Sequence, residues 1–327
     1  MRGPLLRFLL LGLLACGDGG GAPFVAMTFN TGTTEGLNHD EDLADGYTSA
    51  EATISDTHYG DGLAFLPAVA QTRAFFAEVR PDVVAFQEIF YSDECATIPE
   101  DAHAGFVCET WSPGDPTVAL SILPMGYQVA CQLEKPDKCV AVKRSFGVFR
   151  GCDADLCLDH LDGARVPDCG GGSRVGRGVI ERADGTTLTV VSFHGSSGVT
   201  EEEQACRVRQ LEQVFVDLDG EPAANGERNL ILGDFNTDPG RLASGDASAA
   251  RLLDFVATDP ADASRPFRFH SEVGRMAPGS YAGLFDIDHV ISDAFEGACE
   301  IPGFTGERPP VLDFTYFDHA PVICTLR

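Results

Sequence analysis

The chain has 327 residues, of which 44% are hydrophobic and 22% are charged, and its formal net charge is −27. This composition is ample for a large hydrophobic core, and it excludes a protein that binds nucleic acid through a broad basic face. Only three lysines occur, so a polyanionic partner would have to be met locally, with help from a divalent cation.

The N-terminal segment predicts an export signal with a site for lipid attachment. Residues 1–15 combine two arginines with an apolar run of about a dozen residues, which is too short for a stable transmembrane anchor. The ending Leu-Leu-Ala-Cys16 resembles a bacterial lipobox, in which Cys16 is lipidated; an ordinary secretory signal is the alternative. We expect a lipoprotein signal peptide over 1–15, a flexible tether over 16–24 and one domain over 25–327. The protein would then be exported and lipid-anchored to the bacterial membrane or cell surface, or otherwise secreted or periplasmic.

A strand, a helix and a second strand follow one another in the first quarter of the domain. The string VAMTFN predicts a buried strand that ends at Asn30, and residues 31–62 are expected to form a polar loop. Residues 63–79 have helical spacing, and Pro81 ends that helix. PDVVAFQEI is then a strand that carries Glu88 near its end.

The cysteines predict disulfide bonds. Without Cys16, ten remain, an even number in a chain with an export signal. A zinc site is disfavoured because no CxxC pair occurs. Seven of the ten lie in a region of about 91–170 that is rich in Pro, Gly and Asp, and we expect a disulfide-stapled loop region beside the site. Three pairs are near enough in sequence to be partners: Cys95/Cys108, Cys131/Cys139 and Cys299/Cys324.

The second half of the chain continues the alternation of strands and helices. TTLTVVSFH is a β-rich run ending at His194, and a capping box at Thr200 and Glu203 opens a helix over 201–218. NLILGDFNTDP is another strand and turn, and residues 285–292 and 320–326 are strand-like. The pattern predicts an α/β layered fold.

Polar residues at or just past these strand ends indicate phosphoester chemistry. Cleaving a phosphodiester requires a cation that neutralises phosphate charge, an activated water, and donors that favour the pentacoordinate transition state. Glu88 is a hard oxygen ligand of the kind that Mg²⁺, Mn²⁺ or Ca²⁺ prefers. In GDFN, Asp234 and Asn236 are two apart, so one could orient water and the other the phosphate.

The pair Asp318-His319 precedes a last short strand, where the imidazole suits proton transfer. A buried carboxylate should orient that ring, and we expect Asp288 to do so, with Asp286 as the rival. His289 is expected to point the other way.

His194 could donate to a phosphate oxygen or to the leaving group, and Asn30 would be an amide donor or a contact near the metal. Four other histidines lie in polar loops and are expected at the surface: His39, His58, His103 and His160.

This series resembles the endonuclease/exonuclease/phosphatase superfamily, whose fold has two packed β-sheets flanked by helices, a four-layer α/β sandwich of the deoxyribonuclease type. The resemblance covers residues 25–326. It implies that Glu88, with Asn30 and Asp318 nearby, holds the divalent ion. It also implies that His319 paired with Asp288 is the acid/base. Water and phosphate would be handled by four residues: Asn30, His194, Asp234 and Asn236.

Departures from the family pattern narrow the range of expected substrates. His194 stands where abasic-site endonucleases have Tyr, which looks more like the secreted nuclease and sphingomyelinase branches. His289 sits where a Tyr is common. The string LFDIDHVI is unlike the PAWCDR-like string of inositol polyphosphate 5-phosphatases. We expect a metal-dependent phosphodiesterase acting on nucleic acid; a sphingomyelinase-like enzyme acting on phospholipid and a catalytically silent surface binding module are the alternatives. No protein partner is implied.

Overall fold

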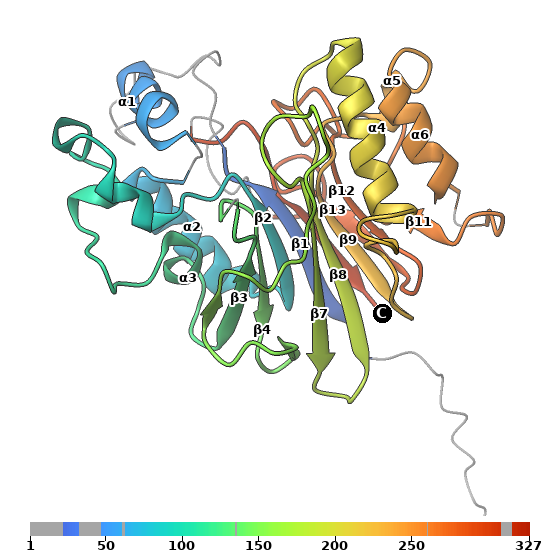
Figure 1. The fold of residues 1–327 in the computed structure, drawn as a ribbon, viewed down its shortest axis with the longest axis horizontal. Helices are drawn as coiled ribbons and strands as arrows, with labels where there is room; N and C mark the ends of the chain where they lie inside the picture. The colour runs from blue at the N-terminus through green and yellow to red at the C-terminus, as the bar shows by residue number, and fades with distance from the viewer. Residues whose placement is uncertain (1–21, 33–46, 61–62, 135, 260, 309–315) are drawn as a thin grey trace, which may run out of the picture.

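The computed structural model describes residues 22–32, 47–60, 63–134, 136–259, 261–308 and 316–327. Two seven-stranded sheets form its centre (Figure 1). In spatial order, the first sheet contains β13 (Gly297–Glu300), β14 (Val322–Leu326), β1 (Phe24–Asn30), β2 (Val83–Gln87), β4 (Cys139–Lys143), β3 (Tyr127–Cys131) and β6 (Leu156–Cys157). The second contains β10 (Val256–Ala257), β11 (Phe267–Phe269), β12 (Asp288–Ser292), β9 (Asn229–Asp234), β8 (Thr187–His194), β7 (Val175–Arg182) and β5 (Gly147–Phe149).

Helices cover the outer faces of both sheets (Figure 1). On the side of the first sheet lie α1 (Ser49–Ile54), a π-helical turn (Ser55–Tyr59), α2 (Leu66–Val79) and α3 (Val118–Ser121), with short 3-10 turns at Ser92–Ala96, Glu100–Ala102 and Val107–Glu109. On the side of the second lie α4 (Glu201–Phe215), α5 (Pro239–Leu242) and α6 (Ala247–Phe255). The predicted four-layer α/β sandwich is confirmed.

The burial of both faces of the central strands explains why their sequences are mainly apolar. Ala26 and Val83 face the layer between the two sheets, where they pack with Leu232 of the second sheet. Their neighbours Met27 and Val84 face outward and pack in the core under α2. Since both faces of these strands are buried, β1 and β2 have few polar residues before their ends, and the hydroxyl of Thr28 donates to Gln87 Oε1 at 3.0 Å.

The helix predictions are confirmed with shifted boundaries. The helix predicted over 63–79 is Leu66–Val79, ending at Arg80, whose φ of 48° breaks the helix before Pro81. The predicted capping box opens α4: the Thr200 hydroxyl accepts from the Glu203 N–H.

The prediction of a polar loop over 31–62 is wrong for its second half. The described residues 49–59 form α1 and the π-helical turn, and Thr48 with Glu51 makes a capping box at the start of α1. That Thr-x-x-Glu pattern was a signal for the helix. Cys16, His39, residues 1–15 and most of the tether lie outside the described residues. None of the helices in the described part of the chain has the length and hydropathy of a membrane span.

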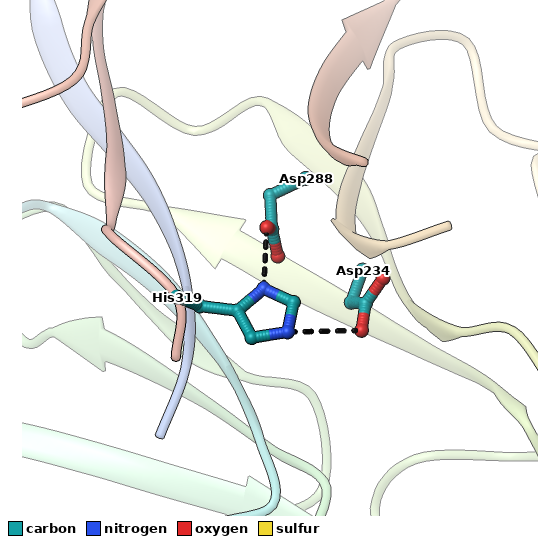
Figure 2. Close-up of side chains that lie close together, drawn as sticks. All are labelled: Asp234, Asp288 and His319. Carbon is teal, nitrogen blue, oxygen red and sulfur yellow. Dashed lines mark hydrogen bonds and ion pairs between the residues drawn. The ribbon is translucent and has the colours of Figure 1, made fainter. Parts of the chain in front are cut away.

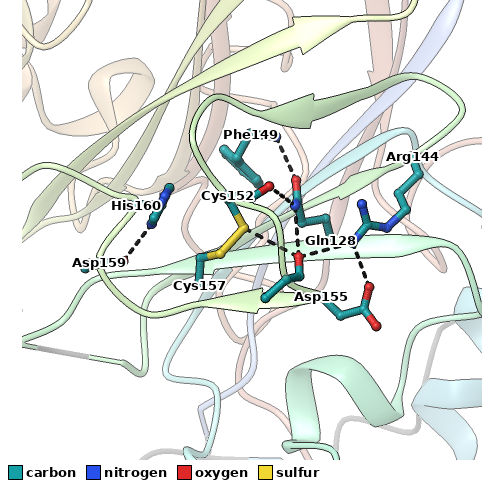
Figure 3. Close-up of a disulfide and its surroundings, with 9 residues drawn as sticks. Gln128, Arg144, Phe149, Cys152, Asp155, Cys157, Asp159 and His160 are labelled. Atoms are coloured by element: carbon teal, nitrogen blue, oxygen red, sulfur yellow. Dashed lines mark hydrogen bonds and ion pairs between the residues drawn. A yellow bond between two sulfur atoms is a disulfide. The ribbon is translucent and has the colours of Figure 1, made fainter.

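Ten cysteines form five disulfides. The three predicted pairs are confirmed: Cys95–Cys108, Cys131–Cys139 and Cys299–Cys324. The other two are Cys152–Cys157 and Cys169–Cys206. Around Cys152–Cys157, the Gln128 amide donates to the carbonyls of Cys152 (2.8 Å) and Ala154 (2.9 Å), which fixes this turn on the edge of the first sheet (Figure 3).

Candidate active site

Strand register brings the predicted residues to one rim. Asp234, the last residue of β9, pairs with His194 at the end of parallel β8 and with Asp288 at the start of antiparallel β12. In the first sheet, Asn30 ends β1 opposite Gln87, and Glu88 follows directly. Because the two sheets are packed face to face, these rows meet across the layer between them.

His319 and Asp288 form a buried pair that joins the two sheets (Figure 2). His319 Nδ1 donates to Asp288 Oδ2 at 2.7 Å, and both residues are buried. Burial by itself would lower the pKa of His319. The charge and hydrogen bond of Asp288, with the charges of Asp234 and Asp318, outweigh burial and raise that pKa well above its usual value. The predicted orientation of His319 by Asp288, and not by Asp286, is what the geometry shows.

Asp234 is the hub of the rim. Its Oδ2 accepts from Asn30 Nδ2 at 3.0 Å and from Asn236 Nδ2 at 3.1 Å. The same oxygen lies 3.8 Å from Nε2 of His194 and 3.8 Å from Nε2 of His319. Burial raises the pKa of Asp234 to about 7; the charge of His319 opposes this shift, and Asp288 adds to it. Asp234 therefore faces four nitrogens through one oxygen.

Glu88 is the most exposed carboxylate of the rim. Its side chain is 29% exposed, against 2% for Asp234 and 8% for Asp318. His194 Nε2 lies 3.2 Å from Glu88 Oε1. Burial alone would raise the pKa of Glu88, but the hydrogen bond and charge of His194, helped by His319 and Asn30, lower it to about 2. Glu88 is consequently ionised at neutral pH.

Backbone strain is concentrated at this rim. Glu88 has a φ of 55° and Asn236 a φ of 50°, in the left-handed region that most side chains avoid. A Cβ at Gly32 would lie 1.9 Å from Glu88 Oε2, so only glycine leaves room for that carboxylate. The fold therefore holds Glu88 in place at a conformational cost, and Gly32 leaves the space that its carboxylate occupies.

A pocket of about 450 Å³ opens over the rim. Of the predicted residues, five line it: Glu88, Asp234, Asn236, Asp318 and His319. Three others, Asn30, His194 and Asp288, stand behind them and contact Asp234, Glu88 and His319, respectively. The remaining wall comes from residues to which the sequence assigned no site role: Asp56, Gly60, Ser197, Gly198, Val199, Thr237, Leu242, Tyr281, Phe285 and Ile287.

The predicted loop region at 91–170 contributes none of the described residues that line the pocket. It is nonetheless attached behind the rim, because the Ile89 N–H donates to the Asp137 carbonyl at 3.0 Å. Burial lowers the pKa of His194, the hydrogen bond and charge of Glu88 oppose this shift, and the charges of Arg174 and of Lys138, which is buried beside Asp137, add to it.

The donor set fits a divalent cation. Asp234, Asp288 and His319 each offer one atom within 4.8 Å of the others. His319 Nδ1 and Asp288 Oδ2 are already joined, however, and Asp288 Oδ1 is buried without a hydrogen-bond partner in the structure. Ionised Glu88 lines the pocket and is the most exposed carboxylate of the rim, so a cation in the pocket can reach it, and hard oxygen ligands suit Mg²⁺, Mn²⁺ or Ca²⁺.

The neighbouring polar residues have separate roles. Asp286 does not contact His319: its N–H donates to Asp238 Oδ2 at 3.1 Å, and burial with the charges of Asp238 and Asp288 raises its pKa to about 9. His289 points away from the rim, as predicted, and lies between Phe235 and Phe269.

The surface histidines are only partly as predicted. His58 is exposed, whereas His103 and His160 are half-buried, His103 Nε2 lying 3.1 Å from the Ile98 carbonyl. His270 was missed: it is buried, and its Nε2 lies 2.7 Å from Ser292 Oγ.

Comparison with known proteins agrees with this architecture. Residues 27–319 match the model of the Endonuclease/Exonuclease/phosphatase family. The human Nocturnin catalytic domain with bound sulfate is similar at 12% identity and a TM-score of 0.49, over 93% of each chain. ANGEL2, a 2′,3′-cyclic phosphatase, is similar at 13% identity and a TM-score of 0.50, over 93% of this chain and 95% of that chain.

A third similar structure is a Staphylococcus aureus beta toxin variant with bound magnesium ions, at 14% identity and a TM-score of 0.47, over 93% of this chain and 99% of that chain. No curated protein matches in sequence. These structural likenesses show the fold alone, whereas the family model spans nearly the whole described chain. The protein therefore belongs to the Endonuclease/Exonuclease/phosphatase family of phosphoester hydrolases.

Proposed function

We propose that the protein is a divalent-metal-dependent phosphodiesterase in which His319, oriented by Asp288, is the general acid and Asp234 is the general base. The observation that carries this proposal is the 2.7 Å bond between His319 Nδ1 and Asp288 Oδ2, which leaves His319 Nε2 facing Asp234 in the pocket. His319 Nε2 and Asp234 Oδ2 are 3.8 Å apart, which is too far for a direct hydrogen bond, so a substrate or water atom between them can contact both groups.

The residues divide the chemistry between them. Asp234, with its pKa near neutrality, positions the attacking water and accepts its proton, while protonated His319 donates toward the phosphoryl or leaving oxygen. Asn236 holds Asp234 and contributes an amide beside the phosphate. Glu88, assisted by Asp318 and Asn30, would hold the cation, which supplies charge neutralisation at the phosphate when bound.

Nucleic acid is the first candidate substrate, as the resemblance to secreted nucleases implies. A phospholipid is the second candidate, because the described residues that line the pocket include four carboxylates and no Lys or Arg. Its other wall is apolar, with Val199, Tyr281 and Phe285. A zwitterionic headgroup carries a positive charge beside its phosphate, so it adds no net negative charge to a pocket lined by carboxylates.

Parallel hydrolysis assays test the proposal and separate the substrates. Purified protein is given duplex DNA, RNA and sphingomyelin with Mg²⁺, Mn²⁺ or Ca²⁺, or with chelator. Metal-dependent cutting of nucleic acid supports the nuclease proposal, and cleavage of sphingomyelin alone promotes the phospholipid. Activity on none of the three, nor on a small chromogenic diester, would favour a silent binding module and reject the proposal.

We also propose that residues 1–15 are a lipoprotein signal peptide and that Cys16 is lipidated, with 16–24 as a tether to the domain at 25–327. The motif at 13–16 and the five disulfides support export. In a bacterial host, the full chain should pellet with membranes and a Cys16→Ser variant should not. Equal pelleting of both would reject lipidation.

A further inference from the structure

A buried arginine outside the pocket connects two of its walls. Arg207, on α4, is 1% exposed. Its Nη1 donates to the carbonyls of Ser196 (2.8 Å) and Gly198 (2.7 Å). Its Nη2 donates to Asp246 Oδ2 at 3.1 Å, and its Nε donates to Ser248 Oγ at 2.8 Å. A charge this deeply buried is costly unless it is paired and fully hydrogen-bonded, and here all three guanidinium nitrogens have partners.

The first wall is the loop Ser196–Val199, which follows His194 and Gly195. Gln210, one turn after Arg207 on α4, accepts from the Ser196 N–H at 2.9 Å and donates to the Ser196 hydroxyl at 2.7 Å. Ser197, Gly198 and Val199 line the pocket, and within the described part of the chain no hydrogen bond is formed by their N–H groups. Arg207 and Gln210 thus hold the loop from behind, while its amides remain available to a ligand.

The second wall is the turn at Asn236–Thr237. Asp246 Oδ2, the oxygen that Arg207 contacts, also accepts from the Thr237 hydroxyl at 2.9 Å, and Thr237 lines the pocket. The other oxygen of Asp246 caps α6 by accepting from the Ser248 N–H at 2.8 Å. One carboxylate therefore ties the GDFN turn to a helix and to Arg207.

We propose that Arg207 is a positioning residue of the active site, which holds the Ser196–Val199 loop and the Asn236–Thr237 turn at the spacing that substrate requires. This inference rests on the proposed function. Strand register and the Asn236 amide, which donates to the Gly195 carbonyl at 3.1 Å, hold the chemical centre independently of Arg207. The loss of Arg207 contacts should therefore impair substrate binding more than the chemical step.

An Arg207→Lys variant tests the proposal, because lysine keeps the charge but cannot span the four partners. We expect KM to rise about tenfold while kcat changes by less than about threefold. The Ser196 amide should exchange with solvent at least about tenfold faster, while amides of β9 keep their wild-type rates. Asp246→Asn, which preserves the cap of α6 but weakens the acceptor for Arg207 and Thr237, should act in the same direction if the lysine variant does not fold.

The matched control is Arg209→Lys, on the same helix. Among the described residues, the Arg209 side chain donates hydrogen bonds to the sulfur atoms of Cys169 and Cys206 and to neither pocket wall, so this change should leave KM and Ser196 exchange at wild-type values. Wild-type KM and wild-type exchange in both Arg207→Lys and Asp246→Asn would overturn the positioning role. If the wild-type protein hydrolyses no phosphodiester, the proposed function fails, and Ser196 exchange alone decides whether Arg207 positions the loop.

Discussion

At the scale of single residues, the chemistry depends on how deeply a histidine and its partner carboxylate are buried. His319 has Asp288 at 2.7 Å and both are buried, whereas half-buried His160 has the exposed Asp159 at 2.6 Å. The same two side-chain types therefore form a shielded pair at the rim and a solvent-screened pair on a loop. Shielding increases the effect of the Asp288 charge on the imidazole.

We predict that His319→Ala lowers kcat roughly a hundredfold to ten-thousandfold, the usual contribution of a general acid or base. The fold should persist, because strand register places Asp234 and Asp288 independently of His319. The measurement is steady-state hydrolysis of the preferred diester, with circular dichroism to verify folding. His160→Ala is the control and should retain wild-type turnover. A His319→Ala enzyme within about threefold of wild type would remove His319 from the acid/base role.

His270 provides a stability prediction at the same scale. Burial lowers its folded-state pKa to about 4, against about 6.5 in an unfolded chain. As pH falls from 6.5 toward 4, the unfolded chain takes up a proton that the folded protein refuses. The contribution of His270 to the free energy of unfolding is therefore fully present above pH 6.5, and it falls by about 3 kcal/mol as the pH drops to 4.

A His270→Gln variant should lose this decline while keeping the hydrogen bond to Ser292. Urea unfolding at several pH values measures it: the free energy of unfolding should fall less steeply between pH 6.5 and 4 in the variant than in wild type. His58→Gln, a change at an exposed position, should keep the wild-type slope. Parallel curves for wild type and His270→Gln would show that another group causes the acid sensitivity.

At the scale of elements, the disulfides close loops of very different lengths. Cys169–Cys206 joins the loop before β7 to α4 across 37 residues, whereas Cys152–Cys157 closes only 5. In the chain-entropy model, the longer loop contributes about 4 kcal/mol and the shorter about 2 kcal/mol, by restricting the unfolded chain.

We predict that replacing Cys169 and Cys206 together by serine lowers the melting temperature more than replacing Cys152 and Cys157 together. Differential scanning calorimetry on the two double variants compares them directly. KM should rise only for the first pair, since Cys206 adjoins Arg207 on α4. The opposite order of melting temperatures would mean that native contacts, and not loop closure, determine these contributions.

Elements also show what sequence could and could not predict. The strand ends at Asn30, Glu88, His194 and Asp234 were predictable because apolar runs stop there, and register does the rest. By contrast, α1 lies within a polar segment whose only strong signal was a capping box.

Long-range contacts left no local pattern in the sequence. Sequence spacing could not reveal the Cys169–Cys206 disulfide, because Cys152 and Cys157 both lie closer in sequence to Cys169 than Cys206 does, at a separation of 37. Arg207 stands in a helix rich in charged residues, and only its tertiary partners show that it is buried. The aromatic wall at Tyr281 and Phe285 lies in an irregular segment without hydrophobic periodicity.

At the scale of the whole molecule, the net charge of −27 acts against polyanionic substrates. At low ionic strength the negative charge of the protein repels nucleic acid and slows its association, and added salt screens this repulsion. The effect is opposite to that for a basic nuclease, whose affinity falls as salt rises.

We therefore predict that, at constant saturating metal, KM for a nucleic acid falls as NaCl is raised from about 20 mM to about 150 mM, over which the screening length shrinks to about 8 Å. KM for a zwitterionic phosphodiester should remain nearly constant. Initial rates on both substrates across that range provide the comparison. A rise in KM for nucleic acid with salt would indicate a basic binding surface, contrary to this charge distribution.

The most direct test of a metal-dependent hydrolytic centre is the release of 4-nitrophenolate from bis(4-nitrophenyl) phosphate by chelator-stripped protein, before and after Mg²⁺ is restored. We expect no turnover in chelator and full recovery with Mg²⁺, and a higher Mg²⁺ requirement in Glu88→Gln because that change removes the ionised carboxylate at the pocket. Equal turnover with chelator and with Mg²⁺ would contradict this expectation.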